Sequence, residues 1–253
     1  MMQDKVILIT GGTSGIGLKA AEIFLKKGAG VVISGRDKDR GEKALAALRL
    51  SCPAGKTAFF PCDVTNTADC SRLVSLAAEA FGGIDVLVNS AGIYQEKALE
   101  DISEEDYSLI MDVNFKGTCF MTKAALPELK KRKGASVVNL SSDAGVQGNY
   151  LCSLYCASKG AVTMFTRAMA LELAPYGIRI NCVCPGDILT PLTERQLAGA
   201  PERDAALREM ASVYPLGRIG TADEAAAVVV FLASEEASFV TGAAWSVDGG
   251  ITA

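Results

Sequence analysis

The chain has 253 residues, a formal charge of −4 from 25 Lys and Arg against 29 Asp and Glu, and no histidine. This mildly acidic balance, with both signs interspersed, argues against nucleic acid as a partner. Without histidine, the usual general base and a common metal ligand are missing. Proton chemistry must therefore use other groups, and no metal site is expected.

The cysteines and the N-terminus indicate a protein that works in a reducing compartment. The eight cysteines contain no C-x-x-C pair, and several, such as Cys182 and Cys184, stand in apolar runs. This pattern predicts reduced, packed thiols rather than disulfides or zinc ligands. No signal peptide is recognisable, and no stretch reaches the roughly 20 apolar residues of a membrane span. We therefore expect a cytoplasmic protein with no membrane partner.

Short apolar runs alternate with longer amphipathic stretches along the chain. The β-branched runs predict strands at 6–10, 31–34, 58–61, 86–89, 137–140 and 178–183. The amphipathic stretches predict helices at about 15–28, 38–50, 67–81, 103–132, 154–175 and 221–234. Apolar strands joined by helices form parallel sheets covered on both faces. The sequence thus predicts an α/β fold, a single doubly wound Rossmann domain over residues 1–253, with ligands beyond the carboxyl ends of the strands.

The first predicted strand leads into the glycine-rich segment 10–17, Thr-Gly-Gly-Thr-Ser-Gly-Ile-Gly, and a helix is expected from about Gly15. Glycines let the backbone turn tightly, and a helix N-terminus offers unpaired N–H groups to a pyrophosphate. The segment therefore predicts a bound dinucleotide, although an ordinary strand–helix turn can also be glycine-rich.

Tyr155 and Lys159 stand four residues apart at the start of a long helical run, 13 residues after Ser142. Four residues make about one helical turn, so both side chains leave the same helix face. The spacing suggests a proton-transfer device, while a surface tyrosine above a solvated lysine is the alternative.

Together these motifs resemble the short-chain dehydrogenase/reductase family over essentially the whole chain. The segment 10–17 matches the cofactor turn of that family, and Asn89-Ser90-Ala91-Gly92 matches its segment after the fourth strand. The catalytic tetrad is matched by Asn114, Ser142, Tyr155 and Lys159. The resemblance implies a seven-stranded sheet and a homotetramer built through helices 103–132 and 154–175, with a second contact through the C-terminal strand.

The resemblance also implies which residues contact a nicotinamide dinucleotide. Asp63 and Val64 match the adenine-contacting pair, and Pro185-Gly186 with Thr190 matches the stretch that holds the nicotinamide. The expected cofactor contacts are Gly11, Thr13, Ser14, Gly15, Ile16, Gly17, Arg36, Asp63, Val64, Asn89, Ala91, Gly92, Tyr155, Lys159, Pro185, Gly186, Ile188 and Thr190.

The expected chemistry is hydride exchange between the nicotinamide and a secondary alcohol or ketone. A phenol supplies the proton if its pKa of about 10 is lowered, and the Lys159 cation is expected to lower it. Ser142 is expected to donate a hydrogen bond to the substrate oxygen, and Asn114 to hold a water that connects Lys159 to solvent. Taken singly, each residue also has a structural interpretation: Ser142 as a turn hydroxyl, Asn114 as a structural amide and Lys159 as a surface charge.

The residues at the end of the second predicted strand indicate which cofactor is preferred. NAD-binding members usually place an acid near Gly35, and here that acid is missing. Arg36 is suited to clamp a 2′-phosphate, so NADP(H) is favoured over NAD(H). Two residues oppose this choice, because Ser14 is not basic and Asp37 could still turn toward the ribose.

The substrate is expected to contact the residues after Ser142, the segment 93–95 and a mobile lid at about 187–215. The first two sets are Asp143, Ala144, Gln147, Asn149 and Tyr150, with Ile93, Tyr94 and Gln95. The mixed lining predicts an alcohol or ketone on a hydrophobic frame, such as a hydroxysteroid or bile acid, but also suits polyols and 3-oxoacyl thioesters.

Two other functions are kept open. Reductases of carrier-linked 3-oxoacyl groups are similar over the full length, but Tyr176 stands where they carry a basic residue, and Lys133 alone matches the second basic contact. A non-catalytic dinucleotide-binding protein is the third possibility, against which the complete tetrad argues.

Overall fold

Seven apolar strands form the centre of the structure, a computed structural model that describes residues 2–253. They are β1 (Val6–Thr10), β2 (Gly30–Gly35), β3 (Thr57–Pro61), β4 (Val86–Asn89), β5 (Ser136–Leu140), β6 (Arg179–Pro185) and β9 (Ala244–Val247). All neighbours are parallel, in the order β3-β2-β1-β4-β5-β6-β9. The predicted doubly wound parallel sheet of seven strands is confirmed. The strand order reverses between β1 and β4, where such folds place their ligands.

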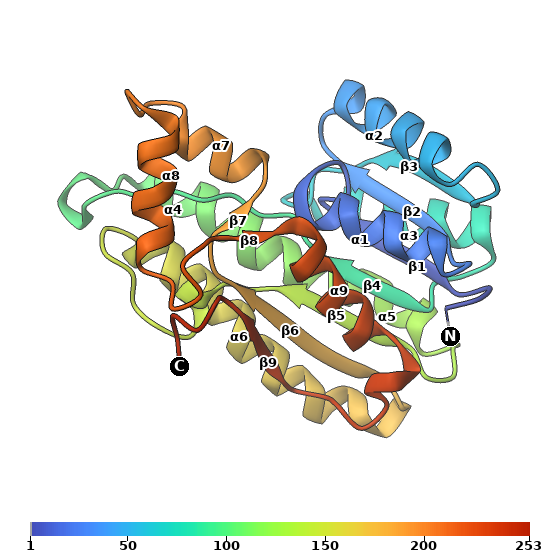
Figure 1. Ribbon diagram of the computed structural model, residues 1–253. Helices are drawn as coiled ribbons and strands as arrows, with labels where there is room; N and C mark the ends of the chain where they lie inside the picture. The colour runs from blue at the N-terminus through green and yellow to red at the C-terminus, as the bar shows by residue number, and fades with distance from the viewer. Residues whose placement is uncertain (1) are drawn as a thin grey trace.

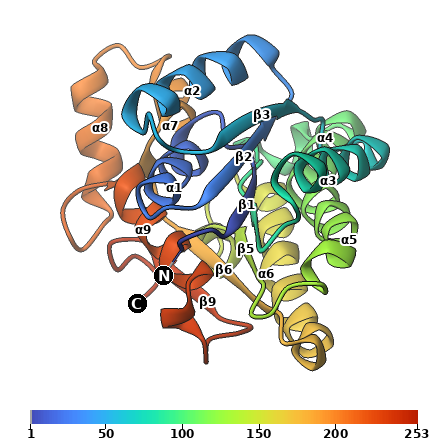
Figure 2. The same ribbon diagram turned by 90° about the vertical axis from the view of Figure 1, so that its right-hand side faces the viewer.

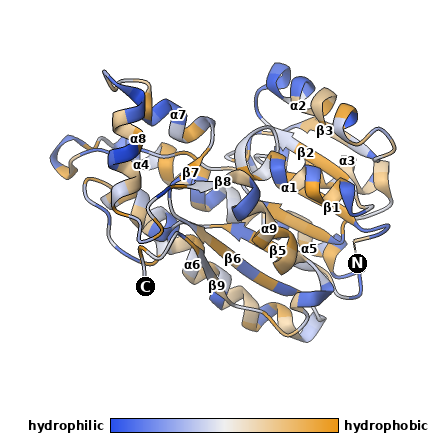
Figure 3. Ribbon diagram, viewed as in Figure 1, coloured by the Kyte–Doolittle hydropathy of each residue, from blue (hydrophilic) through white to orange (hydrophobic). Residues whose placement is uncertain are grey.

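Helices cover both faces of this sheet (Figures 1 and 2). On one face lie α1 (Gly15–Lys26), α2 (Lys38–Ser51) and α9 (Ala222–Ala233), and on the other lie α3 (Thr67–Phe81), α5 (Gly117–Leu129) and α6 (Ser153–Leu173). The alternation along β1 explains the two cores, because successive side chains of a strand point to opposite faces. Ile7 and Ile9 pack with Phe24 of α1, whereas Leu8 packs with Leu73 of α3. Figure 3 shows the apolar residues gathered in these strands.

The helix predicted at 103–132 is continuous but not uniform. It consists of α4 (Glu104–Met111), a π-helical turn η2 (Asp112–Lys116) and α5, which ends at Leu129. The basic run 130–133 follows that end, where cations oppose the negative pole of the helix. Since π-turns in α-helices are frequent at functional sites, the position of Asn114 within η2 is notable.

Two further helices and a short second sheet lie between β6 and α9. They are β7 (Ile188–Leu189), α7 (Pro191–Leu197), α8 (Arg203–Ser212) and β8 (Gly220–Thr221), with β7 and β8 paired in parallel. Figure 1 shows α7 and α8 beyond the carboxyl ends of the central strands. Short 3₁₀ turns complete the fold: η1 (Leu99–Asp101), η3 (Asp143–Gly145), η4 (Ala174–Tyr176) and η5 (Glu235–Ala237).

Side chains close the N-terminal ends of four helices. Asp37 caps α2, Asn66 caps α3, and Ser103 and Thr221 form capping boxes at α4 and α9. At α1, by contrast, Ser14 makes no side-chain cap and the first turn holds no acid. The free N–H groups of α1 are therefore left for another partner.

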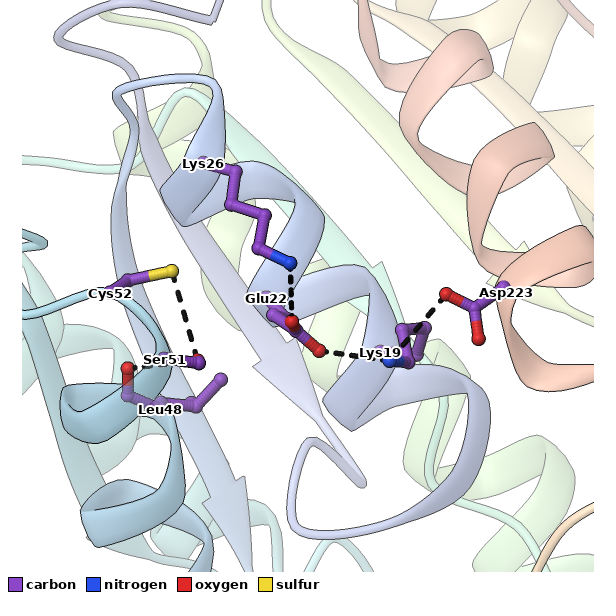
Figure 4. A network of polar contacts seen from close by, with 7 residues as sticks. All are labelled: Lys19, Glu22, Lys26, Leu48, Ser51, Cys52 and Asp223. Carbon is purple, nitrogen blue, oxygen red and sulfur yellow. Dashed lines mark hydrogen bonds and ion pairs between the residues drawn. The ribbon is translucent and has the colours of Figure 1, made fainter.

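A surface network joins α1 to α9 (Figure 4). Lys19 lies 2.9 Å from Glu22 and 3.5 Å from Asp223, and Lys26 lies 2.5 Å from Glu22. Because these groups are substantially exposed, the network contributes little to stability.

Two further observations concern the cysteines and the length of the helices. All eight cysteines are free thiols, as predicted, and five of them are buried. Among residues 2–253, no helix combines the length and apolar character required to cross a bilayer.

Candidate active site

A cleft of about 1480 Å³ opens beyond the carboxyl ends of the strands, at the point where the strand order reverses. It brings together segments from both halves of the chain. Of the predicted cofactor contacts, those that line it are Gly11, Thr13, Ser14, Gly15, Ile16, Arg36, Asp63, Val64, Ala91, Gly92, Tyr155, Lys159, Pro185, Gly186, Ile188 and Thr190.

The glycine-rich turn has the shape that a pyrophosphate needs. Gly11 has a φ of +65° and Gly15 a φ of +54°, in the left-handed region that favours glycine. A Cβ on Gly11 would lie 2.6 Å from the backbone nitrogen of Ala91, so any side chain there would separate β1 from the segment after β4. The uncapped N–H groups of α1 open into the same cleft. These features fit a dinucleotide whose phosphates lie at the helix N-terminus.

Two predicted cofactor residues, Gly17 and Asn89, lie behind this lining. A Cβ on Gly17 would lie 2.6 Å from the carbonyl oxygen of Gly11, so this glycine allows helix and turn to approach. Asn89 donates to Thr122 and to Asn139, at 3.0 and 2.9 Å, beneath the central strands. Gly17 therefore shapes the turn, and Asn89 joins β4 to β5 and α5.

The adenosine end of the cleft carries two guanidinium groups. Arg36 and Arg40 both line it and both are exposed. Asp37 accepts a hydrogen bond from the Arg40 backbone nitrogen at 3.0 Å and so acts as the cap of α2. Sequence reasoning missed Arg40, which lies in the first turn of α2, three residues after the capping Asp37.

The predicted proton-transfer pair lies at the other end of the cleft. Tyr155 and Lys159 come from the first turns of α6, and Ser142 follows β5. The Lys159 ammonium lies 5.8 Å from the centre of the Tyr155 ring and donates to the Leu140 carbonyl at 2.9 Å. Tyr94 packs edge-on against Tyr155 with ring centres 5.0 Å apart. The helix thus presents both groups to the cleft, as the spacing predicts.

Burial sets the acid–base properties of this pair. It lowers the pKa of Lys159 to about 8, because the ammonium loses solvation. Burial also raises the pKa of Tyr155; a hydrogen bond with Ser142 opposes this shift, and the charges of Asp143 and Asp187 reinforce it. The net pKa of Tyr155 is thus raised, not lowered as the sequence predicts, because desolvation of the buried phenol outweighs the hydrogen bond to Ser142 that lowers it. The part of Lys159 in lowering this pKa stays a prediction.

Asn114 lies beside the cleft rather than in it. Its side-chain oxygen accepts from the Ile93 backbone nitrogen at 2.8 Å, and its nitrogen donates to the Ile93 carbonyl and to Ser158, both at 3.0 Å. The amide therefore holds the segment after β4 against the start of α6. Its predicted role as a water holder stays a prediction.

Ser142 is engaged by its neighbours. Its hydroxyl donates to the Asp143 carboxylate at 2.7 Å and accepts from the Ala144 backbone nitrogen at 3.2 Å. Donation to a substrate oxygen, the role that the sequence predicts, requires the hydrogen to leave Asp143. That role also stays a prediction.

Two carboxylates face the reacting end of the cleft. Asp143 is 7% exposed, and its second oxygen accepts from the Asn149 amide at 3.2 Å. Asp187 has a raised pKa because of its burial, and its backbone nitrogen donates to the Tyr214 hydroxyl at 2.7 Å. Within residues 2–253, neither carboxylate forms an ion pair with a Lys or Arg. This end of the cleft is therefore acidic and without a cation paired to either carboxylate.

The sequence predicted only part of the remaining cleft lining. Gln147, Tyr150, Ile93 and residues of the segment 188–214 line the cleft, but Ala144 and Gln95 do not. Gln95 turns away and donates to Asp106 instead. Ile251 also lines the cleft, and no sequence pattern marked it.

Comparisons with known proteins agree with this geometry. Residues 11–252 match the family model described as enoyl-(acyl carrier protein) reductase. L-fucose dehydrogenase from Bos taurus is 42% identical over 97% of this chain and 88% of its own. The NADP-dependent (R)-specific alcohol dehydrogenase from Lentilactobacillus kefiri is 40% identical over 100% and 98%. The solved structure of aldohexose dehydrogenase from Thermoplasma acidophilum aligns with a TM-score of 0.89 and 35% identity, over 99% and 95% of the two chains.

A doubly wound domain with a dinucleotide cleft, and with a tyrosine and a lysine at its reacting end, defines a nicotinamide-dependent oxidoreductase. The chain belongs to the short-chain dehydrogenase/reductase family. It is an NAD(P)-dependent enzyme that acts on CH–OH groups.

Proposed function

We propose that this enzyme interconverts the secondary alcohol and the ketone of a small polyhydroxylated compound, such as a sugar or polyol. The observation that supports this choice is the position of Asp143 and Asp187 beside the proton-transfer pair. An ionised carboxylate offers about four acceptor positions, and Asp143 uses two of them. A buried acceptor gains most from a ligand that donates hydrogen bonds, and several hydroxyl groups supply such donors.

The proposed mechanism assigns one task to each residue. The nicotinamide supplies or accepts the hydride. In reduction, Tyr155 donates its proton to the substrate oxygen, and in oxidation it takes that proton back. Lys159 stabilises the charge left on the phenol, and the Leu140 carbonyl fixes the lysine's position. Asn114 holds the segment that borders the reacting end, so the pocket keeps its shape during turnover.

The names of two relatives support a hydroxyl-rich substrate, since one is an L-fucose dehydrogenase and another an aldohexose dehydrogenase. The hydroxysteroid and bile acid predicted from the sequence fit less well. A bile acid brings its own carboxylate into a cleft with two carboxylates, and like charges repel there. A steroid also has few hydroxyl groups with which to pair them.

The substrate proposal predicts a ranking of catalytic efficiencies. With NADP+ or NAD+, sugars and polyols should be oxidised with a higher kcat/KM than hydroxysteroids, and bile acids should rank below uncharged steroids. The measurement is the rate of absorbance increase at 340 nm with a panel of D- and L-sugars, polyols, cyclopentanol, steroids and bile acids. A steroid or bile acid at the head of the ranking would contradict the proposal.

The carrier-linked 3-oxoacyl reductase remains the second candidate, supported by the description of the matching family model. One residue weighs against it. Tyr176 stands at the position where such reductases carry a basic residue, and its ring packs under the Lys130 ammonium at 3.7 Å. A non-catalytic dinucleotide-binding role stays the least supported alternative.

We also propose that NADP(H) is preferred to NAD(H). Arg36 and Arg40 both line the adenosine end, and the competing interaction of Asp37 is weakened because its carboxylate caps α2. The name of the Lentilactobacillus relative points to the same cofactor. A planar guanidinium can form two hydrogen bonds with a 2′-phosphate, and two guanidinium groups should bind it more tightly than one.

Arg36→Ala should raise the KM for NADPH roughly tenfold, the size expected for one charge-assisted hydrogen bond, and should leave the KM for NADH nearly unchanged. Steady-state kinetics with both cofactors measures this difference. Lys38→Ala is the matched control, because Lys38 is an exposed cation two residues away that does not line the cleft. Equal effects of Arg36→Ala on both cofactors would contradict the assignment.

We further propose that the enzyme assembles as a homotetramer and that segment 187–215 acts as a lid. Exposed apolar side chains support the assembly, with Met164 and Leu171 on α6 and Phe239 and Trp245 near β9. Helix α8 supports the lid, since it buries no residue fully and so is held by few contacts. The cytoplasmic location stays a prediction of the sequence.

A further inference from the structure

Tyr214 lies buried in the segment that follows α8. Its side chain is 6% exposed, and its ring packs between the turns that follow β6 and β9. A Cβ on Gly186 would lie 2.7 Å from Cε1 of this ring, and a Cβ on Gly249 would lie 3.3 Å from its Cδ1. The Leu216 backbone nitrogen also donates to the Gly249 carbonyl at 3.2 Å. Although α8 buries no residue, the segment after it is thus anchored on the central sheet.

The hydroxyl of Tyr214 holds the turn after β6. It accepts a hydrogen bond from the Asp187 backbone nitrogen at 2.7 Å. The phenol keeps its own hydrogen for a second bond, because burial raises its pKa and it stays protonated. The Asp187 carboxylate is the acceptor, since burial raises the pKa of Asp187 and a side-chain hydrogen bond with Tyr214 opposes that rise. One hydroxyl therefore fixes both the backbone and the side chain of Asp187.

The turn that Tyr214 holds lies at the reacting end of the cleft. Gly186 and Asp187 line the cleft together with Tyr155. Burial raises the pKa of Tyr155 most, and the charge of Asp187 adds to this rise, so the two side chains lie close together. A hydride must be transferred next to the group that exchanges the proton, so the nicotinamide half of the cofactor is expected against this turn. The adenosine half is expected at Arg36, at the other end of the cleft.

We propose that Tyr214 is a positioning residue that preforms the turn of Gly186 and Asp187 for the nicotinamide. Binding of the nicotinamide half of the cofactor then depends on the Tyr214 hydroxyl, and binding of the adenosine half does not. The inference rests on the proposed function, since it concerns the cofactor of the same site.

The physical reason is the freedom of the turn without this bond. Glycine restricts the backbone least of all residues, so Gly186 by itself does not hold one conformation. The Asp187 N–H would also need another partner, because a buried backbone donor without an acceptor is costly. The turn would then populate other conformations, and the apparent affinity for the nicotinamide half would fall with the fraction of turns still in the competent one.

Tyr214→Phe removes the hydroxyl and keeps the ring between the two turns. Its dissociation constant for NADPH should rise roughly fivefold to tenfold, the factor expected for one hydrogen bond. The dissociation constant for 2′-phospho-ADP-ribose, which lacks only the nicotinamide ring, should stay within about twofold of the wild-type value. Calorimetric titration of wild type and variant with both ligands gives the two ratios.

Tyr107→Phe is the matched control, because it removes a tyrosine hydroxyl that is 56% exposed on α4 and outside the cleft. It should change neither dissociation constant. Equal weakening of both ligands by Tyr214→Phe would show that Tyr214 supports the cleft in general, and the inference would be wrong. It would be equally wrong if Tyr214→Phe left NADPH binding unaltered.

Hydrogen exchange in the wild type tests the preformed turn without any variant. The Asp187 amide, resolved by fragmentation mass spectrometry, should exchange slowly in the unliganded enzyme, and NADPH should slow it little further. Fast exchange that becomes slow only with NADPH would overturn the inference, because the cofactor would then order the turn. Failure of the wild type to oxidise any alcohol in the panel would instead refute the proposed function, so the two failures are distinguishable.

Discussion

Tyr155→Phe should lower turnover of every substrate by about a thousandfold or more while leaving cofactor affinity nearly unchanged. The phenol is the group placed to exchange the proton, and general acid–base catalysis accounts for a factor of 10² to 10⁴. The ring stays in place, because Tyr94 packs against its edge and phenylalanine keeps that contact. Stopped-flow kinetics and fluorescence titration of NADPH measure the two quantities.

Tyr94→Phe is the matched control for this experiment. Tyr94 lines the same cleft, but its hydroxyl contacts the Cys152 thiol at 3.2 Å. Removal of that hydroxyl should reduce turnover by less than about tenfold, since no proton transfer depends on it. Undiminished turnover in Tyr155→Phe would exclude the phenol as the proton donor.

Lys159→Met should lower the rate of ketone reduction by about a hundredfold and remove its dependence on pH near 8. Burial lowers the pKa of Lys159 to about 8, so the ammonium loses its proton as the pH rises through this value. Tyr155 remains protonated there, because burial raises its pKa. In the wild type, kcat/KM for reduction should therefore fall about tenfold per pH unit above pH 8, since the uncharged amine no longer stabilises the phenolate. Rates measured from pH 6 to 10 test both proteins.

The stability of Lys159→Met gives an independent readout. The pKa of Lys159 lies below its ordinary value of 10.5, so folding of the wild type is opposed by the buried charge at neutral pH. That opposition disappears as the pH rises from about 8 to 10.5. The variant should be more stable than the wild type at pH 7, and the difference should shrink at pH 10. Lys131→Met, which changes an exposed lysine outside the cleft, should show neither effect. A wild-type pH profile that is flat to pH 10 would contradict the role of Lys159.

Patterns within short segments predicted much of the site. The four-residue spacing of Tyr155 and Lys159 fixes one helix face, and the glycines of segment 10–17 require a turn that only a few residues adopt. Such features are local, because backbone geometry alone relates the residues concerned. They led to the correct family and to most of the cleft lining.

Long-range packing decided what local patterns could not reach. The family pattern predicts that Asn114 is a catalytic residue. In the structure, its side-chain amide forms hydrogen bonds with the backbone of Ile93, in a distant segment of the chain. Ile251 enters the cleft only because the sheet brings the end of the chain to the edge where the other lining segments lie. The pKa of Tyr155 moves opposite to the sequence-based expectation, since desolvation depends on how completely other segments cover the group.

The amino-acid sequence by itself determined the fold class, the shape of the glycine-rich turn and the shared helix face of Tyr155 and Lys159, because periodicity and residue type act through neighbouring backbone. Only the tertiary structure decided that Asp143 holds the hydrogen of Ser142 and that two unpaired carboxylates face the reacting end. Hydrogen-bond direction and charge compensation depend on which groups meet in space. The substrate class proposed here therefore rests on the packing of the site more than on its motifs.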